Sequence, residues 1–145
     1  MNKNEAAFTV KYPELVTILE SEIHLQSDIN NTITKQKYMA VWDTGATSSV
    51  ISPKAVKELN LKPVSYTRIV TAGDKKQCAQ YLVDIILPHD IVAKDFLVIE
   101  AELGDYDALI GMDVIGGGDF AVTNFNSKTT LSFRVPSVQE IDFER

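Results

Sequence analysis

Short apolar or alternating segments, separated by turn residues every ten or so positions, make up most of this chain. Strands of this length and spacing are typical of a β-sandwich or a β-barrel. The segment Leu15–Leu25 is rich in β-branched residues and predicts a strand, and Ser27–Thr32 predicts the loop after it. A second strand ends at the apolar run Ala40–Trp42, so we expect the two strands to form a hairpin.

A short helix is predicted after this hairpin. Ser52 is a favourable N-cap, and Pro53 suits the first helical position because the missing N–H is not needed there. An apolar stripe at helical spacing follows, and Asn60 and Pro63 mark the end of the helix.

A long β-hairpin is predicted in the middle of the chain. Thr67–Val70 and Gln80–Leu87 would be its strands, and the polar turn Ala72–Lys75 would be its tip. The pattern itself leaves two interpretations open, an ordinary solvent-exposed hairpin or a mobile flap whose tip projects beyond the barrel.

The C-terminal part predicts a turn, two strands, one helical turn and a last hairpin. These are the turn Pro88–Asp90, the strands Phe96–Ile99 and Ala108–Gly111, the helical turn Met112–Ile115 ended by Gly116–Gly118, and a hairpin of Phe120, Val122 and Thr129–Phe133 around Asn126–Ser127. The tail after Pro136 either frays or adds a strand at a subunit contact.

The chain has 145 residues, of which 45% are hydrophobic and 23% charged. This length and composition favour a single globular domain that spans residues 1–145. We divide it into N-terminal strands (1–37), a motif-bearing core (38–135) and the tail (136–145). The formal net charge of −6 and the absence of clustered Lys and Arg disfavour nucleic acid as a partner.

The single cysteine, Cys78, excludes an intrachain disulfide and fits a reducing compartment; we expect it to be a small structural residue on a hairpin arm. The N-terminus lacks the apolar core of a signal peptide, and no segment approaches the ~18 apolar residues of a membrane span. We therefore expect a cytoplasmic protein that does not bind membranes. His24 and His89 show no metal-ligand spacing, so neither a metal nor another cofactor is expected.

The candidate chemistry lies at Asp43, Thr44 and Gly45, directly after the apolar run Ala40–Trp42. A carboxylate at the end of a buried strand must be hydrogen-bonded, paired or used. Gly45 would allow positive φ and a close backbone approach. On its own the triplet is also compatible with an ordinary turn, because Asp and Gly are common turn residues.

Three ordered segments resemble the retropepsin-like aspartic proteases, in particular their single-domain bacterial and Ddi1-like branch. Ala40–Ser52 is similar to the active-site segment of that family, and Asp107–Asp113 is similar to the strand and short helix that pass behind the catalytic loop. Thr71–Lys75 resembles the tip of the flap. The resemblance implies an all-β fold, a closed acid-protease barrel with a flap hairpin and one or two short helices, assembled as a homodimer.

Hydrolysis at an aspartic site needs two carboxylates that share one proton. The other aspartates lack the Gly-Ala context of Asp43, so the second carboxylate should be Asp43 of another copy. The resemblance implies that Thr44 braces the two loops across the dimer axis and that Gly45 contacts the substrate backbone.

The resemblance also assigns residues to substrate binding and to support of the site. Substrate would contact Ala46, Thr47, Thr71, Ala72, Gly73 and Asp74, while Leu109, Ile110 and Gly111 would pack behind the catalytic loop. Met112 departs from viral members, which place an Arg after this Gly, and the flap tip is more polar than theirs.

The predicted function is that of a homodimeric aspartic endopeptidase acting on protein or peptide substrates. The alternative is a catalytically silent, protease-like peptide-binding or regulatory module. A third hypothesis is an oligomeric structural β-domain in which Asp43 only caps a turn.

Overall fold

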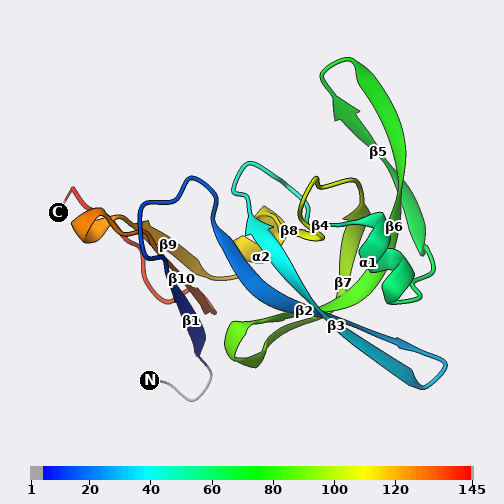
Figure 1. Ribbon diagram of the computed structural model, residues 1–145, viewed down its shortest axis with the longest axis horizontal. Coiled ribbons are helices and arrows are strands. Elements are labelled where there is room, and N and C mark those ends of the chain that lie inside the picture. The colour runs from blue at the N-terminus through cyan, green and yellow to red at the C-terminus, as the bar shows by residue number, and fades with distance from the viewer. Residues whose placement is uncertain (1–4, 145) are drawn as a thin grey trace.

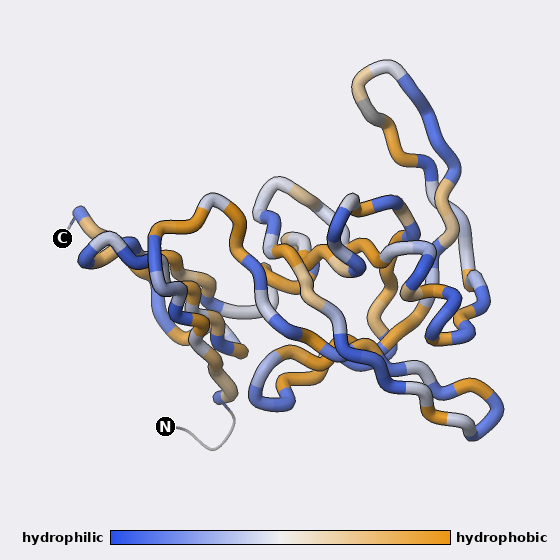
Figure 2. The backbone as a smooth tube through the Cα atoms, in the orientation of Figure 1, coloured by the Kyte–Doolittle hydropathy of each residue, from blue (hydrophilic) through white to orange (hydrophobic). Residues whose placement is uncertain are grey.

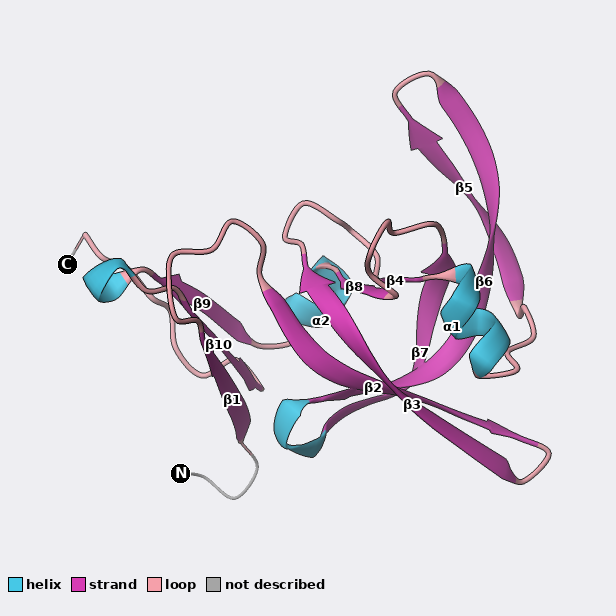
Figure 3. Ribbon diagram, in the orientation of Figure 1, coloured by secondary structure: helices cyan, strands magenta, loops and turns pink. Residues whose placement is uncertain are grey.

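The computed structural model describes residues 5–144, and strands dominate it (Figures 1 and 3). The strands are β1 (Ala6–Lys11), β2 (Glu20–Ile29), β3 (Thr32–Trp42), β4 (Val50–Ile51), β5 (Ser65–Thr71), β6 (Asp74–Leu87), β7 (Ile91–Glu100), β8 (Ala108–Ile110), β9 (Asp119–Thr123) and β10 (Thr130–Val135). The helices are α1 (Pro53–Glu58) and α2 (Met112–Ile115), and the 3-10 turns are η1 (Pro88–Asp90) and η2 (Phe125–Ser127). The predicted all-β class with one or two short helices is confirmed.

Six strands close into a barrel in the order β2-β3-β8-β4-β7-β6, because β6 also pairs with β2. Closure removes the exposed sheet edges that would otherwise pair with other chains. The barrel interior is filled by fully buried aliphatic side chains, among them Ile23, Leu25, Ile85, Val98 and Ile110. The predicted closed barrel is therefore confirmed.

Strand β5 lies outside the closed barrel and pairs only with β6. The β5–β6 hairpin projects away from the barrel (Figure 1). Its two arms differ in hydropathy (Figure 2), since the β5 arm carries Ile69 and Val70 near its end, whereas the paired part of the β6 arm carries the polar residues Lys75–Gln77. The tip is only the two residues Ala72 and Gly73, with Gly73 at φ +107°. The predicted four-residue tip was too long, because Asp74 and Lys75 already belong to β6.

A second sheet of three strands, in the order β1-β10-β9, lies beside the barrel (Figure 1). We call it the terminal sheet. Its β9–β10 hairpin matches the predicted last hairpin, and it packs on the barrel through buried aromatic side chains that include Phe8 and Phe133. The tail adds no strand between 136 and 144, and Val138 N donates to Asp119 Oδ2 at 3.0 Å.

The predicted strand Leu15–Leu25 was wrong in its first half, since β2 begins at Glu20 and residues 12–19 form a loop. Thr129 holds this loop: its backbone N donates to Glu14 O, and its hydroxyl accepts from Val16 N at 3.0 Å. These contacts satisfy backbone groups that a strand would have paired.

The predicted loop Ser27–Thr32 was also too long. The turn is Asn30–Asn31, at φ 51° and 62°, and the strands continue to it on both sides. Asn tolerates this left-handed conformation, which matches the twist of a two-residue hairpin. The hairpin itself, formed by β2 and β3, is confirmed.

No helix of the described residues has the length and apolar character needed to cross a membrane. Within 5–144, no three His, Cys, Asp or Glu side chains gather into a group that could hold a metal ion. Met1–Asn4, part of the segment inspected for a leader, and Arg145 of the tail lie outside the described residues.

Candidate active site

Asp43 begins the loop that joins β3 to β4, at the mouth of the barrel. Its carboxylate is exposed, and Oδ1 accepts a hydrogen bond from the backbone N of Gly45 at 2.8 Å. The N of Ala46 donates to the Asp43 carbonyl at 3.2 Å, which completes a tight turn. The sequence suggested a positive φ at Gly45, and the structure does not show one. A Cβ at this position would lie 3.1 Å from Asp43 Oδ1, so the close approach of the Asp43 carboxylate favours glycine here.

The loop Asp43–Ser49, the catalytic loop below, is held from behind by the segment that joins β8 to α2. Asp43 N donates to the carbonyl of Ile110 at 2.9 Å, and Met112 N donates to the carbonyl of Ala46 at 2.8 Å. Gly111 N donates to the hydroxyl of Ser49 at 3.0 Å. Both ends and the middle of the loop are therefore fixed by the same short segment.

Asp113, in the first turn of α2, extends this support. Its carboxylate accepts from Ser49 N at 2.8 Å and from the Ser49 hydroxyl at 2.7 Å, while Val114 N donates to it at 2.9 Å. Ser49 is only 1% exposed, so its hydroxyl depends on protein partners. Both Asp113 and Asp43 are exposed, but the Asp113 carboxylate is engaged by Ser49 and Val114, whereas Asp43 Oδ1 accepts only from the backbone of its own turn.

Gly111 is required by the close approach of the two segments. A Cβ at this position would lie 2.8 and 2.9 Å from the backbone C and O of Ser48, and 3.0 Å from the carbonyl of Ala46. Real Cβ atoms do not pack this closely against backbone, so any side chain would displace the catalytic loop.

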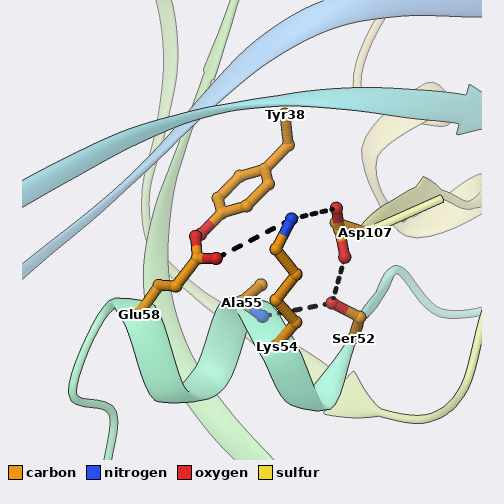
Figure 4. A network of polar contacts seen from close by, with 6 residues as sticks. All are labelled: Tyr38, Ser52, Lys54, Ala55, Glu58 and Asp107. Atoms are coloured by element: carbon orange, nitrogen blue, oxygen red, sulfur yellow. Dashed lines mark hydrogen bonds and ion pairs between the residues drawn. The ribbon is translucent and has the colours of Figure 1, made fainter.

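A polar network joins α1 to Tyr38 of β3 and to Asp107, the residue before β8 (Figure 4). Ser52 Oγ accepts from Ala55 N at 3.1 Å as the predicted N-cap and donates to Asp107 Oδ1 at 2.7 Å. The hydroxyl of Tyr38, on β3, donates to Glu58 Oε2 at 2.7 Å. Burial, together with the neighbouring Glu58 carboxylate, raises the pKa of Tyr38, so the phenol stays neutral and remains a donor.

Trp42, the last residue of β3, directly precedes the catalytic loop. Its backbone N donates to the carbonyl of Leu19 at 2.8 Å, and its indole Nε1 donates to Ser21 Oγ at 2.8 Å. The indole is 5% exposed and packs against the terminal sheet. The residue before Asp43 is therefore held by hydrogen bonds from both its backbone N–H and its indole N–H.

The structure brings together most of the predicted site. Asp43, Thr44, Gly45 and Thr47 are exposed on the catalytic loop, Ala46 and Leu109 are half-buried, and Ile110 and Gly111 are buried behind the loop. The predicted tip residues Thr71, Ala72, Gly73 and Asp74 lie at the far end of the projecting hairpin, which stands away from the loop (Figure 1).

A hollow of about 760 Å³ lies elsewhere, at the far end of the β2–β3 hairpin, where Asp28, Ile33 and Leu61 line it. None of its lining residues belongs to the catalytic loop. The candidate catalytic group, Asp43, therefore lies on the open surface of the loop and not in this hollow.

Sequence reasoning missed three contributors to the site. Ser49 and Asp113 stood inside recognised motifs, but the bond between their side chains joins residues 64 positions apart. Phe120, which packs against Trp42, was assigned only to a hairpin strand. The available signal was the acidic residue at the start of α2, a position where a carboxylate can accept from free backbone N–H groups.

Comparison with known proteins gives a family and a fold. The model of the family described as "gag-polyprotein putative aspartyl protease" matches residues 29–116, more than half of the chain. A retropepsin-like aspartic protease from Rickettsia conorii has a similar structure, with a TM-score of 0.55 and 18% identity over 90% of this chain and 95% of that chain. EIAV protease, solved with the inhibitor HBY-793, gives a TM-score of 0.52 and 19% identity over 74% and 92%. No curated protein sequence matches.

Proposed function

Because this chain belongs to the gag-polyprotein aspartyl protease family, we propose that it is an aspartic endopeptidase that hydrolyses peptide bonds as a homodimer. The observation that carries the proposal is the exposed Asp43 on a loop that hydrogen bonds with Ile110, Gly111 and Met112 hold in place. A surface turn has no need of such support, whereas a reacting group must be held in place.

The proposed reaction uses two Asp43 carboxylates, one from each subunit. Two adjacent carboxylates repel one another when both are ionised, so the pair shares one proton. The ionised partner takes a proton from the attacking water, and the protonated partner donates a hydrogen bond to the carbonyl oxygen of the scissile peptide. The water oxygen bonds to the carbonyl carbon, and the protonated partner transfers its proton to the carbonyl oxygen. The intermediate then collapses: the carboxyl that received the water proton protonates the nitrogen, the other carboxylate takes a proton from a hydroxyl of the intermediate, and the C–N bond breaks.

We place the second carboxylate on another copy because Asp113, the acid on the segment that supports the catalytic loop, is already engaged. Its carboxylate accepts three hydrogen bonds, two from Ser49 and one from Val114. A two-fold axis beside the catalytic loop would place identical groups face to face, as isologous interfaces do. In that arrangement Thr44 braces the two loops.

Substrate would bind as an added strand between the catalytic loop and the β5–β6 hairpin, which would act as a flap. Gly45, Ala46 and Thr47 would contact the substrate from the loop side. The end of the hairpin, from Thr71 to Asp74, would close from the other side and exclude bulk water. The single cysteine favours a reducing location such as the cytoplasm.

Asp43→Asn tests the proposal directly. Wild type, Asp43→Asn and the control Asp28→Asn, which removes another exposed carboxylate at the far end of β2, are incubated with a peptide library from acid to neutral pH. We expect cleavage by wild type and Asp28→Asn, and a loss of about a thousandfold or more in Asp43→Asn. Cleavage that survives in Asp43→Asn contradicts the proposal.

The same three proteins and peptide library distinguish the proposed protease from the alternative, a catalytically silent peptide-binding or regulatory module. A peptide-binding module would bind library members with equal affinity in wild type and Asp43→Asn, and neither protein would release products. Its motivation is the polar hairpin tip and Met112, which stands where viral relatives place an Arg. The Asp113–Ser49 contact weakens that motivation, because it supports the catalytic loop within one chain.

A further inference from the structure

Each strand of the terminal sheet contributes one phenylalanine to a single row. Phe8 of β1 lies directly opposite Phe133 of β10, and Phe133 lies directly opposite Phe120 of β9. Residues opposite one another on neighbouring antiparallel strands project from the same face of a sheet. We call these three residues the phenylalanine row.

The phenylalanine row packs against one side chain of the barrel, Trp42. Its ring centroid lies 5.7 Å from Phe8, 5.4 Å from Phe133 and 5.8 Å from Phe120. Phe8 and Phe133 meet the indole at tilts of 51° and 54°, whereas Phe120 lies nearly parallel to it at 15°. The stacked Phe120 therefore covers one face of the indole.

The indole is also fixed at its polar edge, where Nε1 donates to Ser21 Oγ at 2.8 Å. Ser21 is 4% exposed, so this bond is shielded from water. A ring held by a hydrogen bond at its edge and by Phe120 on its face keeps one orientation.

Trp42 is the residue immediately before Asp43. Trp42 N donates to the carbonyl of Leu19, and Asp43 N donates to the carbonyl of Ile110. A rotation or shift of the Trp42 side chain would therefore move the backbone at the point from which the Asp43 carboxylate projects. Trp42 therefore connects the phenylalanine row of the terminal sheet to the candidate catalytic group.

We propose that Phe120 and Trp42 are positioning residues: their stack holds Asp43 in the orientation that the paired-carboxylate reaction requires. The inference deepens the proposed function and rests on it. Displacements of about 1 Å at a reacting group can reduce turnover by about a hundredfold. The terminal sheet thus contributes to turnover without touching substrate.

The test replaces Phe120 rather than its neighbours in the row. Phe8 and Phe133 are 3% and 1% exposed, so their loss would endanger the fold, whereas Phe120 is half-buried. Phe120→Leu keeps an apolar side chain and removes the stack, and Phe120→Tyr keeps the stack. The matched control is Phe125→Leu, because Phe125 follows the same strand and is 80% exposed.

We expect Phe120→Leu to lower kcat per dimer about tenfold with KM changed by less than about twofold, since the substrate contacts remain. Phe120→Tyr should restore most of kcat, and Phe125→Leu should match wild type. Trp42 is the sole tryptophan, so a change in its emission, seen in Phe120→Leu alone, reports loss of the stack. If Phe120→Leu fails to fold, Ser21→Ala removes the other contact of the indole and should give the same split.

Each other result overturns the inference. The inference is overturned if Phe120→Leu has an unchanged kcat, if only its KM changes, or if Phe125→Leu loses as much kcat. In each of these cases turnover by wild type leaves the proposed function standing. Absence of turnover by wild type at every pH overturns the proposed function, and this inference with it.

Discussion

The carboxylate of Asp113 accepts hydrogen bonds from both the backbone N and the hydroxyl of Ser49, at 2.8 and 2.7 Å. Ser49 ends the catalytic loop, and its hydroxyl in turn accepts from Gly111 N. The two residues connect the loop to α2 within one chain.

A double-mutant cycle on Ser49→Ala and Asp113→Ala should show strong coupling. Each single change should lower the free energy of unfolding by about 1–3 kcal/mol, because each leaves a partner unsatisfied. The double change should cost less than the sum, with a coupling energy of about 1 kcal/mol or more. Urea unfolding measures all four free energies, and strictly additive losses would show that the contact is not formed.

Gly111→Ala should disrupt the site more than the fold. The added Cβ would lie within 3.0 Å of the backbone of Ser48 and Ala46, so the catalytic loop must shift. We expect a loss of about 1–3 kcal/mol in the free energy of unfolding and near-complete loss of peptide cleavage. Gly104→Ala is the control: its Cβ meets nothing, although its φ of +64° costs about 1 kcal/mol. Retained cleavage in Gly111→Ala would refute this account of the loop.

Tyr38→Phe should lower the free energy of unfolding by about 1 kcal/mol, because it removes the hydrogen bond to Glu58 and leaves packing intact. Urea unfolding measures the change. Combining it with Glu58→Gln should show coupling between the two positions, and independence of the two changes would contradict the network of Figure 4.

Local patterning of the sequence was sufficient to place α1 and α2, whereas the closed barrel and the catalytic loop were expected from the resemblance to the retropepsin-like proteases. Ser52 and Pro53 specify the start of α1 through the geometry of a helix N-terminus, and the structure confirms it. The β2–β3 hairpin is likewise local, and only the extent of its turn was wrong.

What the sequence did not reveal depends on distant contacts. The loop at 12–19 exists because Thr129, more than a hundred residues away, bonds to it. The Asp113–Ser49 contact and the packing of Phe120 on Trp42 also join distant residues. Strand propensity favoured Leu15–Leu19 as a strand, but tertiary contacts decided otherwise.

The attachment of the tail should depend on pH through Asp119. Hydrogen bonds from Ser137, Val138 and Arg134 hold the pKa of Asp119 well below its usual value of 3.8. A depressed pKa in the folded state means that its stabilisation is complete above pH 3.8 and is lost as pH falls below that value. Wild type should therefore have a higher Tm than Asp119→Asn at neutral pH, and the difference should shrink in strong acid. A difference that grows as pH falls would contradict this assignment.

The central claim is that one active site needs Asp43 from two subunits. Mixing wild type with Asp43→Asn at constant total concentration, after subunits exchange, tests it most directly. If each site needs both carboxylates, an equal mixture of the two proteins should retain about a quarter of the wild-type rate, because only that share of dimers carries two aspartates. A rate that falls in direct proportion to the wild-type fraction, to about half in the equal mixture, would show that one chain works alone and would contradict the account.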